Sequence, residues 1–260
     1  MSDPTPLLRI DGISVHFGGL VAISDMSFDV HEGEIVSLIG PNGAGKTTAF
    51  NSITGYLQPA SGQSLYRGRN LNGLKPNQIA DLGVVRTFQK TSVFAGNTVF
   101  ENILIGLHRR GTQSLAGALL RLPRMRTEER RLREAASELL TFIGLDKRPD
   151  ELASALPYGE QRLLEVAVGM AAQPKLLLLD EPASGMNPSE TVDFVNMVDR
   201  IRARGVTILL VEHDMRVVMG VSDRVVVLNQ GEIIAEGPPA AIQRHPEVIR
   251  AYLSTGAAHA

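Results

Sequence analysis

The loop at residues 40–48, GPNGAGKTT, constrains the fold of this chain more than any other feature. It matches the pattern G-x-x-x-x-G-K-[ST], in which glycines let backbone N–H groups turn toward phosphate oxygens. The apolar run Glu34–Ile39 before the loop is typical of a buried strand, and the run from Lys46 to about Leu57 is typical of a helix start. This strand, loop and helix order predicts a nucleotide phosphate site in an α/β protein.

Two side chains of the loop have predicted chemical roles. Lys46 is placed to reach the β- and γ-phosphates, and the Thr47 hydroxyl is placed to ligate Mg²⁺. ATP and Mg²⁺ are therefore the expected cofactors. The candidate nucleotide ligands in the loop are Gly40, Asn42, Gly43, Ala44, Gly45, Lys46, Thr47 and Thr48.

A pair of carboxylates follows a second apolar run. The segment Lys175–Glu181 reads KLLLLDE, which is typical of a buried strand with two acids at its end. Ligands of open α/β sheets bind at the carboxyl ends of the strands. We expect Asp180 to hold Mg²⁺ directly or through water, and Glu181 to act as the general base that polarises the attacking water.

The pattern of the whole chain predicts an α/β fold: a P-loop NTPase core with an N-terminal β subdomain and an inserted α-helical subdomain. The runs Leu7–Val15 and Ala22–Val30 indicate paired strands, and a long charged helix is expected at Glu128–Phe142. Thr98 and Glu101 have the spacing of a capping box at a helix start. The expected division is 1–92 and 166–238 for the ATPase core, 93–165 for the helical subdomain and 239–260 for a C-terminal helical tail.

Composition excludes several classes of function. The 260-residue chain has no cysteine, so disulfides, thiolate catalysis and Cys-ligated zinc are impossible. Its net charge of −2 gives no reason to expect a nucleic-acid partner. No apolar run approaches the length of a membrane-spanning helix, and the N-terminus lacks the pattern of a signal peptide.

The order of five motifs resembles the ATP-binding subunit of an ABC transporter. They are GPNGAGKTT at 40–48, VRTFQ at 85–89, LPYGEQ at 156–161, KLLLLDEP at 175–182 and VEHD at 211–214. The resemblance, which covers nearly the whole chain, implies that Phe17 stacks on adenine and that His213 contacts the γ-phosphate. It also implies that Gln89 contacts Mg²⁺ and the attacking water and links the core to the helical insert. The implied catalytic residues are Glu181, His213 and Gln89, and the implied metal ligands are Thr47, Gln89 and Asp180.

The LPYGEQ segment occupies the signature position of that family, whose usual form is LSGGQ. Pro157 replaces the serine, so the contact that the serine hydroxyl makes with the γ-phosphate must come from elsewhere. Gly159 and the helix start after it can still offer N–H groups to an anion. The resemblance implies that Tyr158, Gly159 and Glu160 cover ATP held by Lys46 of a second ATP-binding subunit.

Further segments resemble the ATPases of branched-chain amino acid importers. They are FGGLVA at 17–22, LPYGEQRLLEVA at 156–167, EPASGMNP at 181–188 and PEVIRAYL at 246–253. The implied function is the energy-coupling subunit of an importer for branched-chain or related hydrophobic amino acids, at the cytoplasmic face of the inner membrane. The implied partners are transmembrane permease subunits, a second ATP-binding subunit, identical or different, and a periplasmic solute-binding protein.

Two other functions fit the same motif order. One is the ATPase subunit of an exporter of lipid or lipopolysaccharide, and the other is a soluble ABC-type ATPase. The segment Phe17–Ala22, the insert Gly117–Met125 and the AYL residues at 251–253 favour import. The soluble ATPases of this type usually carry two cassettes or a long coiled coil, and the chain shows neither pattern.

Eight arginines lie between Arg109 and Arg133 in the predicted helical insert. They predict either a patch that faces lipid or nucleic acid, or a solvated helix face. The second interpretation is favoured, because Glu128, Glu129 and Glu134 lie at helical spacing from several of the arginines and offset their charge.

Overall fold

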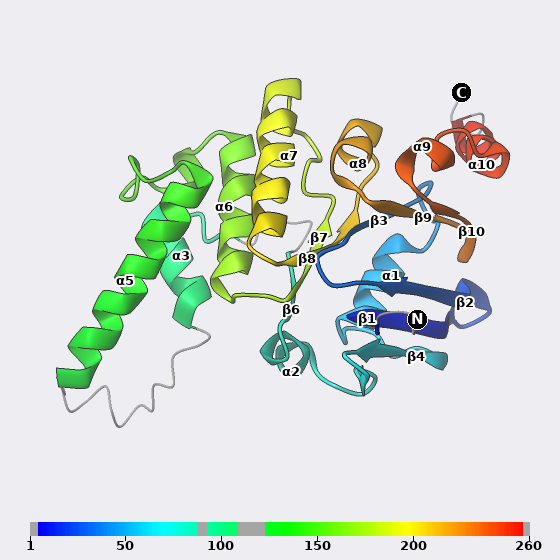
Figure 1. The fold of residues 1–260 in the computed structure, drawn as a ribbon, viewed down its shortest axis with the longest axis horizontal. Coiled ribbons are helices and arrows are strands. Elements are labelled where there is room, and N and C mark those ends of the chain that lie inside the picture. Colours follow the sequence, from blue (N-terminus) through cyan, green and yellow to red (C-terminus); the bar gives the residue numbers. More distant parts are fainter. Residues whose placement is uncertain (1–4, 88–92, 109–122, 257–260) are drawn as a thin grey trace. The chain divides into compact units, whose positions relative to one another are not determined.

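The computed structural model describes residues 5–87, 93–108 and 123–256 (Figure 1). The chain divides into two compact units. The first unit comprises Met1–Gln89, Lys175–Ser184 and Pro188–Ala260. The second unit comprises Lys90–Pro174 and Gly185–Asn187.

An antiparallel sheet begins the first unit, with the strand order β2-β1-β4-β5 among the described residues. Its strands are β1 (Leu8–Phe17), β2 (Leu20–Val30), β4 (Ser61–Tyr66) and β5 (Arg69–Asn70). The β1–β2 hairpin confirms the expected strand pair. Both strands continue to the turn at Gly18–Gly19, so they extend beyond the predicted runs.

A second sheet of the same unit has the strand order β10-β9-β3-β8-β7-β6 in the described part of the chain. Its strands are β3 (Ile35–Ile39), β6 (Val84–Arg86), β7 (Leu176–Asp180), β8 (Thr207–Val211), β9 (Arg224–Asn229) and β10 (Glu232–Gly237). All neighbours pair in parallel except β10, which is antiparallel to β9. Every residue of β3, β7 and β8 is buried, which explains their nearly continuous apolar sequences.

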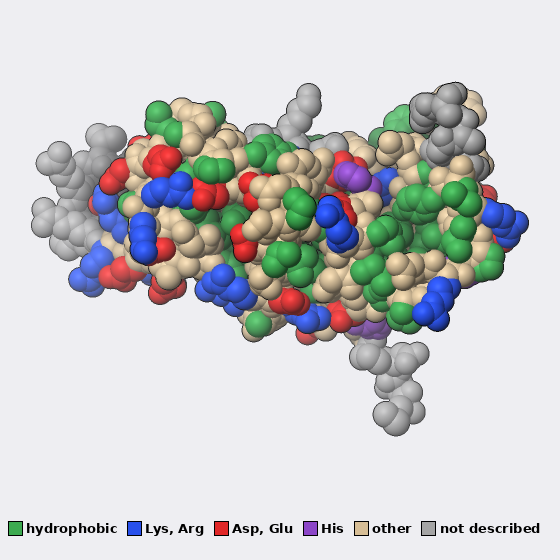
Figure 2. Space-filling view, turned by 90° about the horizontal axis from the view of Figure 1, so that it is seen from above, with side chains coloured by type: hydrophobic (Ala, Val, Ile, Leu, Met, Phe, Trp, Pro, Cys, Tyr) green, Lys and Arg blue, Asp and Glu red, His purple; other side chains and the backbone are tan. Residues whose placement is uncertain are grey.

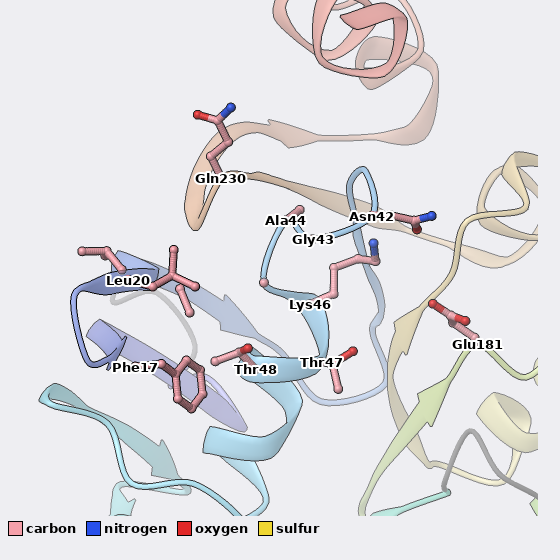
Figure 3. Close-up of a pocket in the computed structure, with 13 residues that line it drawn as sticks. Phe17, Leu20, Asn42, Gly43, Ala44, Lys46, Thr47, Thr48, Glu181 and Gln230 are labelled. Carbon is pink, nitrogen blue, oxygen red and sulfur yellow. The ribbon is translucent and has the colours of Figure 1, made fainter. Parts of the chain in front are cut away.

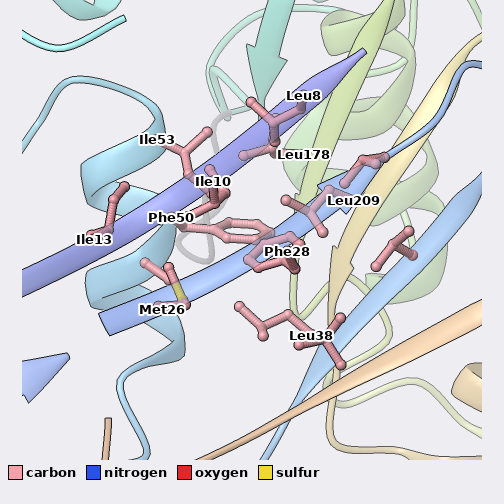
Figure 4. Packing of buried hydrophobic residues seen from close by; sticks show 14 of the residues in the cluster. Leu8, Ile10, Ile13, Met26, Phe28, Leu38, Phe50, Ile53, Leu178 and Leu209 are labelled. Atoms are coloured by element: carbon pink, nitrogen blue, oxygen red, sulfur yellow. The ribbon is translucent and has the colours of Figure 1, made fainter. Parts of the chain in front are cut away.

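Helices of the first unit follow the strand ends and build the core. They are α1 (Lys46–Ile53), α2 (Pro76–Asp81), α7 (Pro188–Ala203), α8 (Met215–Val221), α9 (Pro239–Ile242) and α10 (Pro246–Gly256). Phe50 of α1 is fully buried in a cluster with residues of both sheets, among them Phe28, Leu178 and Leu209 (Figure 4). This packing fixes α1, and therefore the loop that precedes it, against the sheets.

The second unit is helical. Its elements are α3 (Val99–His108), α5 (Pro123–Ile143), a short 3₁₀ helix (Ala153–Ala155) and α6 (Tyr158–Ala171). The predicted capping box is confirmed at the start of α3, because the Thr98 amide donates to Glu101 Oε2 at 2.8 Å and the Glu101 amide donates to Thr98 Oγ1 at 3.1 Å.

The boundary expected between residues 165 and 166 needs correction. It falls inside α6, which is one continuous helix, whereas the compact units divide between Pro174 and Lys175. The physical reason is the close packing of α6 on α3: a Cβ added to Gly106 of α3 would lie 2.7 Å from the Val168 carbonyl oxygen. The whole helix therefore belongs with the helical unit.

The described arginines of α5 fit a solvated helix face. Arg133 pairs with Glu129 at 3.0 Å and Arg130 with Glu134 at 3.7 Å, and all four side chains are more than half exposed. Figure 2 shows basic and acidic side chains interspersed over this unit. Arg109, Arg110 and Arg121 lie outside the described residues. Where the structure describes the chain, none of its helices has the length and apolar character needed to cross a bilayer.

Candidate functional site

A pocket of about 680 Å³ surrounds the phosphate loop in the first unit (Figure 3). Its walls come from the β1–β2 hairpin, the loop, the start of α1, the end of β7 and the β9–β10 turn. Most of the loop residues predicted to bind nucleotide line it. The lining residues are Phe17, Leu20, Val21, Ala22, Asn42, Gly43, Ala44, Gly45, Lys46, Thr47, Thr48, Glu181 and Gln230.

The backbone of the loop requires glycine at the helix junction. Gly45 is the N-cap of α1 and has φ +108°, a conformation that residues with a Cβ rarely adopt. A Cβ at this position would also lie 2.7 Å from the Ala22 carbonyl oxygen. Among the described residues, no side chain caps the helix start, so its N–H groups and the helix dipole remain available to an anion in the pocket.

Lys46 is the buried cation of the pocket, with 6% of its surface exposed. Its Nζ donates to the carbonyl oxygens of Gly40 at 2.6 Å and Pro41 at 3.0 Å. Burial lowers the pKa of Lys46, and the carboxylates of Glu181 and Asp180 oppose that shift. The ammonium group is thus held over the loop, where phosphate oxygens would offer it stronger acceptors than the two carbonyls.

The two predicted carboxylates differ in their surroundings. Asp180, the last residue of β7, is 4% exposed and accepts a hydrogen bond from Arg86 at 2.7 Å. Glu181 lines the pocket, has φ +46°, and donates its amide to the Val211 carbonyl at 2.8 Å. The Thr47 hydroxyl lies in the same pocket. A hydroxyl and carboxylates are hard oxygen donors, so this set fits a cation such as Mg²⁺ bound together with phosphates.

The hairpin end of the pocket is apolar. Phe17, Leu20 and Val21 are 50%, 66% and 47% exposed, and Figure 3 shows Phe17 and Leu20 on the opposite side of the loop from Glu181. An exposed aromatic ring beside a phosphate site can stack on a nucleotide base.

His213 follows β8 and does not line the pocket in the described structure; its side chain is 53% exposed. Its backbone is fixed by Glu212, which is fully buried and accepts from the amides of His213 at 2.9 Å and Asp214 at 3.2 Å. Glu212 also accepts from the Ala183 amide at 2.8 Å. Gln89, the remaining predicted catalytic residue and metal ligand, lies outside the described residues.

The signature residues belong to the second unit. Tyr158, Gly159 and Glu160 form the first turn of α6, with Pro157 as N-cap. The Tyr158 hydroxyl accepts from Arg162 at 2.7 Å, and Glu160 pairs with Arg148 at 2.5 Å. Tyr158, Gly159 and Glu160 are not among the residues that line the pocket of the first unit, so their contact with nucleotide stays a prediction.

Three residues near the pocket were missed by the sequence argument. Arg86 was quoted only as part of the VRTFQ motif and Glu212 only as part of VEHD. No sequence pattern singled out Gln230. An arginine three residues before the predicted ligand Gln89 was the available signal for Arg86. Nothing local distinguishes Gln230 from an ordinary turn residue.

Comparison with known proteins agrees with this geometry. Residues 23–184 match the family model of the ABC transporter, and residues 232–253 match that of the branched-chain amino acid ATP-binding cassette transporter. The chain is 47% identical to the high-affinity branched-chain amino acid transport ATP-binding protein LivG of Escherichia coli (strain K12), over 95% of this chain and 98% of that protein. It is 43% identical to the corresponding BraF protein of Pseudomonas aeruginosa, with the same coverage of both chains.

Solved structures show the same similarity. The ADP conformation of MJ1267, an ATP-binding cassette of an ABC transporter, matches with a TM-score of 0.84 and 31% identity, over 96% of this chain and 99% of that one. A nucleotide-free ATP-binding cassette from an ABC transporter matches with a TM-score of 0.83 and 32% identity, over 95% and 99%. The chain therefore belongs to the ABC transporter family and, within it, groups with the branched-chain amino acid transport ATP-binding proteins.

Proposed function

We propose that this chain is the ATP-hydrolysing, energy-coupling subunit of an importer for branched-chain amino acids. The observation that carries the proposal is the pocket in which the phosphate loop, Lys46 and Glu181 meet. The relatives with near-complete coverage are named as branched-chain amino acid transport proteins, which favours import over lipid export or a soluble role.

The proposed chemistry uses residues of this pocket together with Asp180, His213 and Gln89. The N–H groups at the start of α1 and the Lys46 ammonium bind the phosphates of ATP, and Lys46 then exchanges its loop carbonyls for phosphate oxygens. Thr47, Asp180 and Gln89 are proposed to hold Mg²⁺, which offsets charge on the phosphates during transfer. Glu181 polarises the attacking water, and His213 contacts the γ-phosphate once its segment approaches the nucleotide.

The proposed assembly contains other chains. Tyr158, Gly159 and Glu160 cover ATP bound at Lys46 of a second ATP-binding subunit, so closure of the pair depends on the γ-phosphate. The helical unit carries that movement to transmembrane permease subunits, and a periplasmic solute-binding protein delivers the amino acid. The chain then lies at the cytoplasmic face of the inner membrane.

The test is uptake of radiolabelled leucine into proteoliposomes that contain this chain with its co-purifying permease subunits, with ATP on the side of this chain and the solute-binding protein on the other. The matched control is the same complex with Glu181→Gln. We expect ATP-dependent accumulation of leucine by the complex that contains the natural chain, and none by the complex that contains Glu181→Gln. Hydrolysis without accumulation of any branched-chain amino acid would contradict the proposal.

A further inference from the structure

Arg86 connects the end of β6 to the end of β7. It is the last residue of β6, and its side chain is 6% exposed. Its Nη2 donates to Asp180 Oδ2 at 2.7 Å, in an ion pair whose carboxylate is 4% exposed. Among the described residues, no hydrogen bond is made to the other oxygen, Oδ1. The ion pair therefore fixes the Asp180 carboxylate through one oxygen and leaves the other to the site.

The same guanidinium group also binds α1. Its Nη1 donates to Asn51 Oδ1 at 2.8 Å and to Thr54 Oγ1 at 3.3 Å. The group lies 5.4 Å from the centre of the Phe50 ring, the residue that anchors α1 in the core. Asn51 stands one helical turn after Thr47 and Thr54 is the C-cap of α1, so the contact holds the last turn of this short helix.

These contacts join the elements that carry two of the three proposed metal ligands, Thr47 and Asp180. Thr47 is in the first turn of α1, and Asp180 ends β7; the two residues belong to segments that are far apart along the chain. One buried guanidinium holds both segments at once, through a planar fork of donors with fixed geometry.

We infer that Arg86 is a positioning residue that sets the separation of Thr47 and Asp180 and so prepares the site for Mg²⁺ bound with ATP. This inference rests on the proposed function, because it assigns those two residues to the metal. Mutation of residues that hold metal ligands in place typically lowers metal affinity or activity by about 10–100-fold. A lysine at position 86 keeps the charge but lacks the two separated, coplanar nitrogens with which the guanidinium reaches Asn51 and Asp180.

The experiment measures the affinity of a fluorescent ATP analogue with Mg²⁺ and with EDTA, for the natural chain and for Arg86→Lys. We expect Mg²⁺ to tighten binding by the natural chain. In Arg86→Lys the affinity in EDTA should be unchanged, while the gain from Mg²⁺ should fall by about 10–100-fold. A loss confined to the Mg²⁺ condition is a readout that general destabilisation of the fold would not produce.

Arg224→Lys is the matched control. Arg224 is a partly buried arginine of the same unit that makes two bonds to Glu34, at 2.7 and 2.9 Å, away from the pocket lining. The Arg224→Lys variant should bind the ATP analogue with unchanged affinity both with Mg²⁺ and with EDTA. Asn51→Ala is a second test, which removes one partner of Arg86 without unpairing a buried charge; it should reduce the gain from Mg²⁺ in the same direction by a smaller factor.

The possible results separate the two claims. Equal losses with Mg²⁺ and with EDTA, or a full Mg²⁺ gain in both Arg86→Lys and Asn51→Ala, would overturn the role of Arg86 and leave the proposed function intact. Absence of any Mg²⁺ gain in the natural chain would overturn the metal site itself, and the role of Arg86 with it. Should Arg86→Lys not fold, the result for Asn51→Ala decides.

Discussion

Replacement of Glu212 by glutamine tests how the segments around the pocket are held. Glu212 is fully buried, and its Oε1 accepts from the Ala183 amide while its Oε2 accepts from the amides of His213 and Asp214. One carboxylate therefore ties the segment after Glu181 to the segment that contains His213.

The expected destabilisation by Glu212→Gln follows from the loss of one hydrogen-bond acceptor. A glutamine has one oxygen in place of two, so at least one of these amides must face its NH₂ group. If the oxygen keeps the two bonds to His213 and Asp214, the Ala183 amide is left buried without an acceptor. Such a group costs about 1–3 kcal/mol of the free energy of unfolding.

The shifted pKa of Glu212 predicts how the effect of the substitution on stability changes with pH. Burial raises the pKa of Glu212 above its ordinary value of 4.5, although the three amide bonds act to lower it. The native state therefore holds the proton more tightly than the unfolded state. The stability that Glu212 contributes is fully present below pH 4.5 and is lost as the pH rises through the raised pKa.

The measurement is urea unfolding of the natural chain and of Glu212→Gln across the acid to neutral range. The variant should be less stable, and the difference should be largest at acid pH. Glu34→Gln is a matched control of opposite sign: burial acts to raise the pKa of Glu34, but bonds from Arg224 and the His31 amide outweigh it and lower the pKa. The stability lost in that variant should therefore shrink as the pH falls. An equally stable Glu212→Gln chain, or a difference that grows with pH, would refute the reasoning.

Three further predictions address the nucleotide site and the helical unit. Lys46→Ala should lose ATP affinity as well as rate, because Lys46 meets phosphate charge in the ground state; titration with a fluorescent ATP analogue checks this, and natural affinity would contradict it. Gly185→Ala should lower the free energy of unfolding more than Gly144→Ala. Both glycines have positive φ, which costs about 1–2 kcal/mol for alanine. Only at Gly185 would the added Cβ also meet the Tyr158 ring, at 3.1 Å. Equal unfolding midpoints of the two variants would rule out that contact. The Glu181→Gln chain should be mostly monomeric without nucleotide and form dimers with saturating ATP or with partner chains; a monomer by light scattering in all these conditions would exclude the proposed closure.

Local patterns account for the parts of the fold and site that the sequence predicted. The phosphate loop, its flanking strand and its helix occupy one contiguous segment, so a short motif determines their order. The strand that ends at Asp180 is recognisable because burial on both faces demands an apolar run. The capping box of Thr98 and Glu101 depends on residues three positions apart.

Contacts between distant segments account for what the sequence did not predict. Arg86 and Asp180 are 94 positions apart, and Glu212 and Ala183 are 29 apart, so only tertiary structure brings each pair together. The boundary between the units was misplaced because the packing of α6 on α3 depends on a close approach at Gly106, which leaves no periodic signal in either helix.

The most direct test of the central claim compares phosphate release from ATP by the natural chain and by Glu181→Gln, each in the assembled transporter, with ATP binding measured on the same samples. Glu181 lines the pocket and is the proposed general base. We predict that the variant binds ATP with natural affinity and releases phosphate about 10²–10⁴-fold more slowly. Equal rates of phosphate release from both chains would contradict the account.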